Sequence, residues 1–263
     1  MSCWDTYEHR IETRGGTKRG AAYKREVRFI NKRLKDNLSF KSIKLYGQDC
    51  GYNITDEEMS SKAITKQLAI IKSDNLNEKY LYSQAGDDIE LGALVEWEDN
   101  RWLVTEKDAD RTVYSGALME QCNFLLRWVE DDGKIYEQWC IISDGTKYLT
   151  GEMEDRHFIA TRGDSRIAMV IARNEHTVKF DRKSRFLIDD PESEMKLSYQ
   201  LTKPMKLGYT FNGLGIFKFV LQEVSSTQDD NYELGIADYY VHFPKENSQG
   251  SDDSPESERR SWL

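Results

Sequence analysis

From residue 91 onward, short apolar and aromatic runs alternate with turn sequences, and this pattern constrains the fold more than any other feature of the chain. Such runs between turn signals indicate β-strands. We expect strands at residues 93–98, 101–105, 123–129, 135–142, 166–171, 184–188, 196–202, 216–224 and 236–241. Short strands at this spacing predict a mainly β chain built from a small barrel and a sandwich.

Turn sequences within this region predict two hairpins. Residues 99–100 separate the first pair of strands, and residues 131–133 separate the second pair. If residues 132–133 form a two-residue turn, Leu126 lies opposite Trp139, and one face of the second hairpin becomes apolar and aromatic.

The N-terminal part is expected to contain one helix. Residues 15–20 form a loose glycine-rich opening, and residues 21–35 have the spacing of an amphipathic helix. The apolar residues at helical spacing are Tyr23, Val27, Ile30 and Leu34.

The next segments alternate between strand and helix signals. Residues 38–46 alternate in the manner of a strand. Residues 55–72 are ambiguous, because Thr55 and Glu58 fit a helix capping box while an apolar run follows them. We favour a strand at residues 66–72.

These signals divide the chain into four parts. We expect a basic N-terminal arm with a helix at residues 1–37 and a small SH3-like or OB-like β-barrel at residues 38–152. An immunoglobulin-like β-sandwich is expected at residues 153–243. The polar, acidic composition of residues 244–263 predicts a flexible C-terminal tail.

Charge is distributed unevenly along the chain. The net charge is −9, yet residues 1–44 hold twelve lysines and arginines against five acidic residues, or +7. The remaining chain therefore carries −16. A basic arm on an acidic body predicts contact with nucleic acid, an acidic protein surface or another copy of the same body. The residues expected to bind this partner are Lys18, Arg19, Lys24, Arg25, Arg28, Lys32 and Arg33.

Cysteine and histidine spacing predicts no metal site. The four cysteines are far apart in the sequence, and the four histidines do not have the spacing of metal ligands. We expect free thiols in a reducing compartment. No apolar run approaches the roughly 18 residues of a membrane span, and the N-terminus does not have the pattern of a secretory signal.

Catalytic motifs are also missing from the sequence. It has no phosphate-binding loop, nucleophile elbow, zinc-protease helix or kinase motif. Paired aspartates at residues 87–88, 131–132, 189–190 and 229–230 lie at expected turns, where aspartate suits the backbone. Residues 213–215 (Gly-Leu-Gly) are interpreted as part of a hairpin turn. We therefore expect no enzymatic activity and no cofactor.

A few other residues have functional alternatives. His157 and His176 are candidates for acid–base chemistry, although no nucleophile lies near either in the sequence. Residues 162–164 form an Arg-Gly-Asp tripeptide, for which a plain turn is favoured. Four tryptophans suit either a sugar-stacking platform or the protein core, and we favour the core. These are Trp97, Trp102, Trp128 and Trp139.

Several segments between residues 91 and 241 resemble a group of virion structural proteins from tailed bacteriophages of Gram-positive hosts. In the first half of this region they are residues 91–97 (LGALVEW), 102–106 (WLVTE), 121–128 (QCNFLLRW) and 145–151 (GTKYLTG). In the second half they are residues 161–167 (TRGDSRI), 177–180 (TVKF), 185–189 (RFLID) and 236–240 (IADYY). None of these motifs is catalytic.

The resemblance implies a head–tail connector, or neck protein, that is made in the bacterial host cytoplasm and located in the virion. It implies a cyclic oligomer with sixfold or twelvefold symmetry, beside the portal and adjacent neck and tail proteins, with passing contact to genomic DNA. Two alternatives stay open. One is a carbohydrate-binding or host-recognition component of the tail or baseplate. The other is a DNA-binding accessory protein that uses the basic arm.

Overall fold

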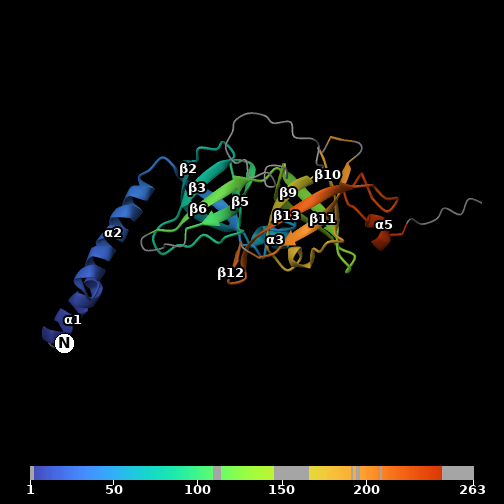
Figure 1. Ribbon diagram of the computed structural model, residues 1–263. Helices are drawn as coiled ribbons and strands as arrows, with labels where there is room; N and C mark the ends of the chain where they lie inside the picture. The colour runs from blue at the N-terminus through green and yellow to red at the C-terminus, as the bar shows by residue number, and fades with distance from the viewer. Residues whose placement is uncertain are drawn as a thin grey trace, which may run out of the picture.

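A helical arm and two β units lie in a row in this protein (Figure 1). The computed structural model describes residues 3–108, 114–144, 166–190, 192–193, 196–207 and 209–244. Within these residues most regular structure is strand, which confirms the predicted mainly β class. No helix in this part of the chain is long and apolar enough to cross a membrane.

The first β unit is a closed barrel. Its strands, in spatial order, are β1 (Phe40–Tyr46), β2 (Ile64–Lys72), β3 (Glu78–Tyr82), β6 (Gly116–Gln121), β5 (Asn100–Lys107) and β4 (Leu94–Trp97). Antiparallel pairing of β1 with β4 closes the barrel. Leu68, Leu81 and Met119 are fully buried in its interior. The predicted small barrel is thus confirmed, with one strand more than the five of an OB-fold.

The second β unit is a single, nearly closed sheet. Its strands, in spatial order, are β10 (Arg185–Ile188), β11 (Leu197–Met205), β13 (Leu214–Val224), β9 (Arg166–Ala172), β8 (Ile135–Asp144) and β7 (Phe124–Val129). A short strand, β12 (Thr210–Phe211), pairs with β13, and the outermost strands β7 and β10 lie in contact. A register shift in β11 between Leu201 and Lys203 is of the kind that bends a strand. The unit expected as an immunoglobulin-like sandwich is therefore barrel-like.

The boundary between the two β units lies earlier than predicted. We expected it between residues 152 and 153, but β7 and β8 belong to the second sheet, where β8 pairs with β9. Leu126 and Cys140 of this hairpin pack in one core with Met169 and Phe217. The first unit therefore ends with β6, just before β7.

Both predicted hairpins form with a shifted register, by one residue in β7–β8 and by two residues in β4–β5, where Trp97 lies opposite Asn100. In the β7–β8 hairpin Leu126 lies opposite Gln138, not opposite Trp139 as predicted. Gly133 has a φ of +72°, which is typical of a three-residue turn with a glycine bulge. In the β4–β5 hairpin the turn residues are Glu98 and Asp99, which both have positive φ.

The arm consists of two helices rather than the one predicted. These are α1 (Cys3–Arg14), which was not predicted, and α2 (Lys18–Lys35). The glycines expected in a loose opening form a tight corner, because a Cβ on Gly20 would lie 2.0 Å from the carbonyl oxygen of Gly15. The Thr17 hydroxyl accepts a hydrogen bond from the Gly20 N–H at 3.0 Å, so α2 begins earlier than expected.

Two further segments test the sequence interpretation. The strand favoured at residues 66–72 is confirmed as β2, and a short helix, α3 (Glu57–Ser61), precedes it. The strand expected at 236–241 is wrong, because this segment contains the short helix α5 (Tyr239–His242) and only Ile236 forms a bridge. The tail after residue 244 lies outside the described residues.

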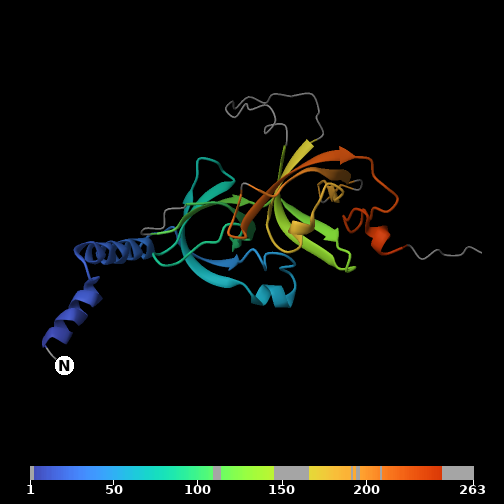
Figure 2. The ribbon, with the colours of Figure 1, turned by 60° about the horizontal axis from the view of Figure 1, so that its bottom comes forward.

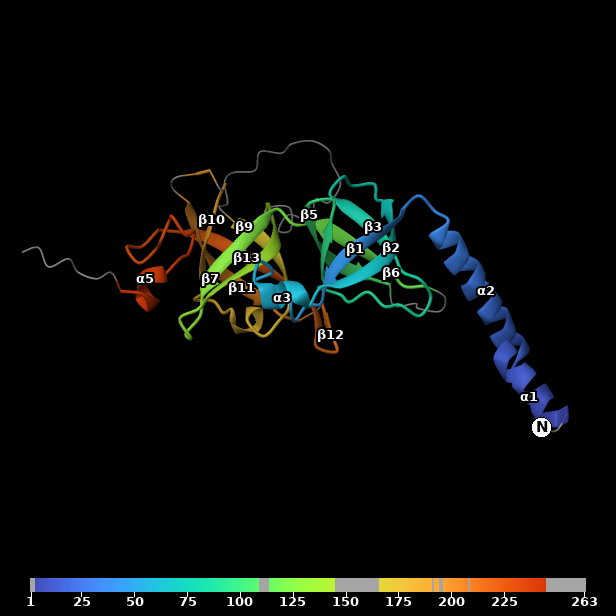
Figure 3. The same ribbon diagram turned by 180° about the vertical axis from the view of Figure 1, so that it is seen from behind.

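The two β units share an interface core. Tyr46, Leu94 and Leu103 of the barrel pack against Val170 and Ile216 of the second sheet. Figure 3 shows the two units adjoining when the molecule is viewed from behind.

Polar and backbone contacts tighten this junction. The buried Gln48 amide donates to the Gly213 carbonyl at 3.0 Å and accepts from the Gly215 N–H at 2.8 Å. Gly92 has a φ of +83°, and a Cβ there would lie 2.2 Å from the Gly215 carbonyl oxygen. The two units therefore approach each other too closely for a side chain at this point.

Candidate functional site

The seven basic residues predicted to bind a partner all lie on α2 and are exposed. They are Lys18, Arg19, Lys24, Arg25, Arg28, Lys32 and Arg33. Four residues with i, i+3, i+4, i+7 spacing occupy one face of this helix, namely Arg25, Arg28, Phe29 and Lys32. We call this surface the basic face. Phe29 is 55% exposed, and the Arg33 guanidinium lies 4.7 Å from its ring centroid.

The opposite side of α2 is less polar. Val27, Ile30 and Leu34 are half-buried there, as the predicted apolar stripe requires, whereas Tyr23 is 45% exposed. The Asn31 side chain accepts a hydrogen bond from the backbone N–H of Ala85 at 2.9 Å. This contact fastens the second half of α2 to the barrel and leaves the basic face exposed.

The basic face has little engagement within its own chain. Arg25 Nε donates to the Ala21 carbonyl of the preceding turn at 3.4 Å. Arg28 and Lys32 form no ion pair with any residue in the described ranges. These charges are consequently accessible to a partner.

A cleft of about 800 Å³ lies at the other end of the molecule, beside α5. Figure 2 shows the arm and α5 at opposite ends of the row. The aromatic residues lining the cleft are Trp128, Phe180 and Phe186. The charged residues lining it are Glu130, Asp131, Asp132, Asp181 and Asp238, together with Lys179, Lys183 and Arg185. The cleft thus has an aromatic floor and an excess of carboxylates.

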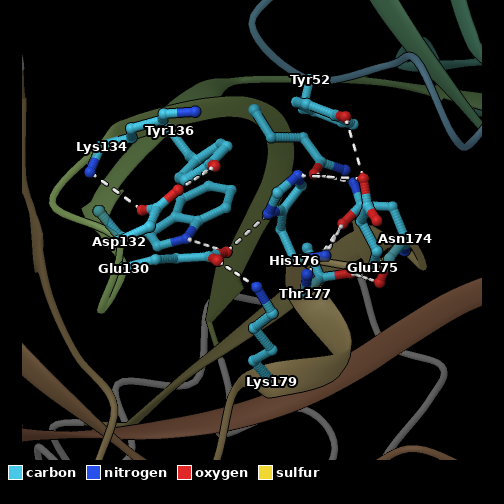
Figure 4. A network of polar contacts seen from close by, with 12 residues as sticks. Tyr52, Glu130, Asp132, Lys134, Tyr136, Asn174, Glu175, His176, Thr177 and Lys179 are labelled. Atoms are coloured by element: carbon cyan, nitrogen blue, oxygen red, sulfur yellow. Dashed lines mark hydrogen bonds and ion pairs between the residues drawn. The ribbon is translucent and has the colours of Figure 1, made fainter.

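A polar network centred on Glu130 forms one wall of the cleft (Figure 4). The Glu130 carboxylate contacts His176 Nδ1 at 2.8 Å and forms an ion pair with Lys179. The hydrogen bond to Glu130 raises the pKa of the exposed Lys179 ammonium above its ordinary value. This network ties the β7–β8 turn to the segment that follows β9.

His176 is engaged on both ring nitrogens. Its Nε2 atom lies 3.5 Å from a carboxylate oxygen of Glu175, and Glu130 occupies the Nδ1 side. The rings of Tyr136 and Tyr52 pack against it with centroids at 4.0 and 4.5 Å. A buried imidazole held this way joins packed elements, and this environment favours a structural role over acid–base chemistry.

Asp132 and Tyr136 form a second polar contact at the same turn. The Tyr136 hydroxyl donates to Asp132 at 2.9 Å. Burial, followed by this bond to a carboxylate, raises the pKa of Tyr136 to about 12. The Lys134 backbone N–H donates to the exposed Asp132 carboxylate and lowers the pKa of that group.

Arg185 forms an ion-pair cluster below the cleft. Its guanidinium binds Asp230 in a bidentate manner at 3.0 and 3.2 Å, pairs with Asp238 and donates to Ser198 at 2.9 Å. The Asp230 side chain is fully buried. The sequence indicates that Asp230 is a turn residue. The structure shows that Asp230 is also the buried partner of Arg185, which its position after a predicted strand did not reveal.

The remaining candidates from the sequence are four tryptophans, the cysteines, His157 and the tripeptide at residues 162–164. Trp102 and Trp128 are buried, and Trp97 and Trp139 are half-buried against core clusters, as favoured over a sugar platform. Cys50, Cys122 and Cys140 are free thiols, and no metal-binding cluster occurs among the described residues. His157 and the tripeptide at 162–164 lie outside the described residues.

Comparisons with known proteins give little further guidance. No protein-family model matches the chain, and no curated protein matches it. The structure of a K. pneumonia MrkH–c-di-GMP complex is 10% identical, covers 79% of this chain and 88% of its own, and has a TM-score of 0.24. The Bacillus subtilis inhibitor of motility MotI/DgrA is 12% identical, with coverages of 77% and 95% and a TM-score of 0.17. TM-scores this low do not establish a shared fold.

Proposed function

We propose that this chain is a structural component of a tailed-phage virion, which self-associates into a ring at the head–tail junction. The observation that carries the proposal is the arm, which extends from a rigid β body and exposes a basic face (Figure 1). A helix with accessible cations is suited to a neighbouring acidic surface, and the chain after residue 44 carries a net charge of −16. The sequence resemblance to virion structural proteins supports the same assignment.

The body suits a wall component. The interface core and Gln48 join its two β units, so the body can transmit load as one piece. A ring subunit requires no active site, and both ring nitrogens of His176 are occupied by carboxylates. We propose that the chain is not an enzyme.

Electron microscopy tests the proposal. Negative-stain images of the purified full-length protein should show closed rings, and gold-labelled antibodies should mark the neck of purified virions. A protein that forms no ring, and that is absent from purified particles, would contradict the assignment.

DNA binding through the arm is a second candidate function. The observation that favours it is Phe29, an exposed aromatic residue among the cations of the basic face. Aromatic stacking and lysine or arginine contacts with phosphate are the means by which proteins hold nucleic acid. Fluorescence anisotropy with labelled DNA would then show an affinity that falls steeply with salt and is lost in Arg28→Glu. No binding at low salt would reject this candidate.

Glycan binding has less support. A sugar platform needs exposed tryptophans beside a groove, and Trp128, which lines the cleft, is only 5% exposed. The virion-ring proposal accounts for the arm, which glycan binding leaves without a role.

A further inference from the structure

We propose that the basic face of one copy docks into the cleft of the next copy, so that subunits associate head to tail. This inference rests on the proposed self-association and names its contact surfaces. The basic face consists of Arg25, Arg28, Phe29 and Lys32, and the cleft is the aromatic-floored hollow beside α5.

The positions of the two surfaces exclude contact within one molecule. The arm leaves the barrel at one end of the row, and α5 lies at the other end in all three ribbon views (Figures 1, 2 and 3). An arm can therefore reach a cleft only in another copy. Unlike surfaces that join in this way form a heterologous contact, which closes a ring when the rotation between neighbouring subunits divides a full turn, as the proposed function requires.

The charges of the two surfaces are complementary. Two of the cations in the cleft are already neutralised, because Lys179 pairs with Glu130 and Arg185 pairs with Asp230. The exposed Asp131, Asp132 and Asp181 carboxylates form no ion pair within the described ranges, and the one cation of the cleft that is likewise unpaired there is Lys183. The cleft rim consequently presents unneutralised negative charge to the arginines of the arm.

The apolar parts also match. Phe29 is exposed within the basic face, and the 61% exposed Val241 lines the cleft next to the buried Trp128 and Phe180. A hollow of about 800 Å³ is large enough for a few side chains. An aromatic anchor surrounded by arginines is the composition of an interface hot spot.

A mixing experiment tests this contact. The arm variant carries Arg25→Glu and Phe29→Ala, and the cleft variant carries Asp131→Arg and Val241→Arg. All four side chains are exposed, so both full-length proteins should keep the wild-type circular dichroism spectrum. By sedimentation velocity, each variant alone should self-associate at least about tenfold more weakly than the wild type.

The mixture gives the sharpest result. The intact arm of the cleft variant should enter the intact cleft of the arm variant, and the mutated surfaces should block further growth. The two variants together should therefore form a one-to-one dimer. The matched control, Asp74→Arg with Leu76→Arg, places the same charge change in the exposed β2–β3 loop and should assemble as the wild type does.

Two results would overturn the inference. If the cleft variant assembles as the wild type does while the arm variant does not, the cleft assignment is wrong and arm-mediated self-association stands. If both variants assemble as the wild type does, the arm has no role in assembly and the proposed function loses its basis as well.

Discussion

Asn31 of α2 accepts a hydrogen bond from the backbone N–H of Ala85, and this 2.9 Å contact joins the arm to the barrel. Ala85 lies in the loop after β3, so the contact fixes the helix against the barrel wall. The half-buried Leu34 lies one turn further along the same helix. The arm therefore leaves the body in a defined direction, with its basic face free to meet a partner.

Loss of the Asn31 side chain should loosen the arm without unfolding the body. Asn31→Ala removes one hydrogen bond, worth about 1 kcal/mol, between α2 and the barrel. Amide hydrogen exchange should then become faster in residues 18–35, while the melting temperature of the β units stays unchanged. The control is Glu26→Ala on the exposed side of α2. Equal exchange rates in the two variants would show that the contact does not hold the arm.

The junction of the two β units should be intolerant of any side chain at Gly92. An alanine there has an unfavourable positive φ and also meets the Gly215 carbonyl oxygen. Gly86 has a φ of +95° but has nothing near its Cβ position. Urea unfolding should show a loss of about 1 kcal/mol for Gly86→Ala. The loss for Gly92→Ala should be larger by about 1–3 kcal/mol, because overpacking adds to the backbone strain.

Equal losses at the two glycines would contradict the close approach of the two units. In that case the conformational preference alone would account for both losses.

The buried ion pair should dominate the stability of the second sheet. Asp230→Ala leaves the Arg185 guanidinium without its bidentate partner, which we expect to cost about 3–5 kcal/mol in chemical unfolding. The control is Arg127→Ala, which breaks the more exposed pair with Glu137 and should cost less than about 1 kcal/mol. A loss no larger than that of the control would contradict a dominant contribution of the Arg185–Asp230 pair.

The same pair should give the protein a characteristic sensitivity to acid. Burial raises the pKa of Asp230, but hydrogen bonds from the N–H groups of Thr227 and Asp238 and from Arg185 outweigh it, so the net pKa lies below 3.8. A lowered pKa stabilises the folded state fully above about pH 4, and this contribution is lost as the pH falls through the folded pKa. Between pH 5 and pH 2, unfolding free energy should therefore decline less steeply in Asp230→Ala than in the wild type.

The Tyr136 hydroxyl should ionise at a higher pH than the hydroxyls of the exposed tyrosines. Burial and its bond to Asp132 raise its pKa to about 12, so the stabilisation that it gives is present below about pH 10 and is lost as the pH rises through 12. The absorbance difference between the wild type and Tyr136→Phe at 295 nm isolates this phenolate from the other tyrosines. Asp132→Asn should move its midpoint toward 10. A midpoint near 10 in the wild type would contradict the buried hydrogen bond.

Local sequence patterns predicted most of the strands but not their long-range pairing. Alternation and turn residues found the β7–β8 hairpin, because both signals are local. The one-residue shift arose from Gly133, whose positive φ selects a three-residue turn. That β8 pairs with β9, and so belongs to the second sheet, depends on packing of Leu126 and Cys140 against distant residues, which no local pattern contains.

Of the two candidate surfaces, the basic face could be predicted from local sequence and the cleft could not. The basic face could be predicted because charge and helical spacing are both local, and the seven predicted residues are all exposed on α2. The cleft could not, because the fold brings Glu130, His176 and Arg185 together from three separate segments. The helix α1 was not predicted, although its apolar residues Trp4, Tyr7 and Ile11 have helical spacing.

The most direct test of the account is the mass of the full-length protein in solution at two salt concentrations. Sedimentation velocity should show an oligomer at about 0.05 M salt. At about 1 M salt, where the Debye length falls to about 3 Å, it should dissociate with an unchanged circular dichroism spectrum. A monomer at both salt concentrations would contradict the claim that the basic arm binds a neighbouring copy.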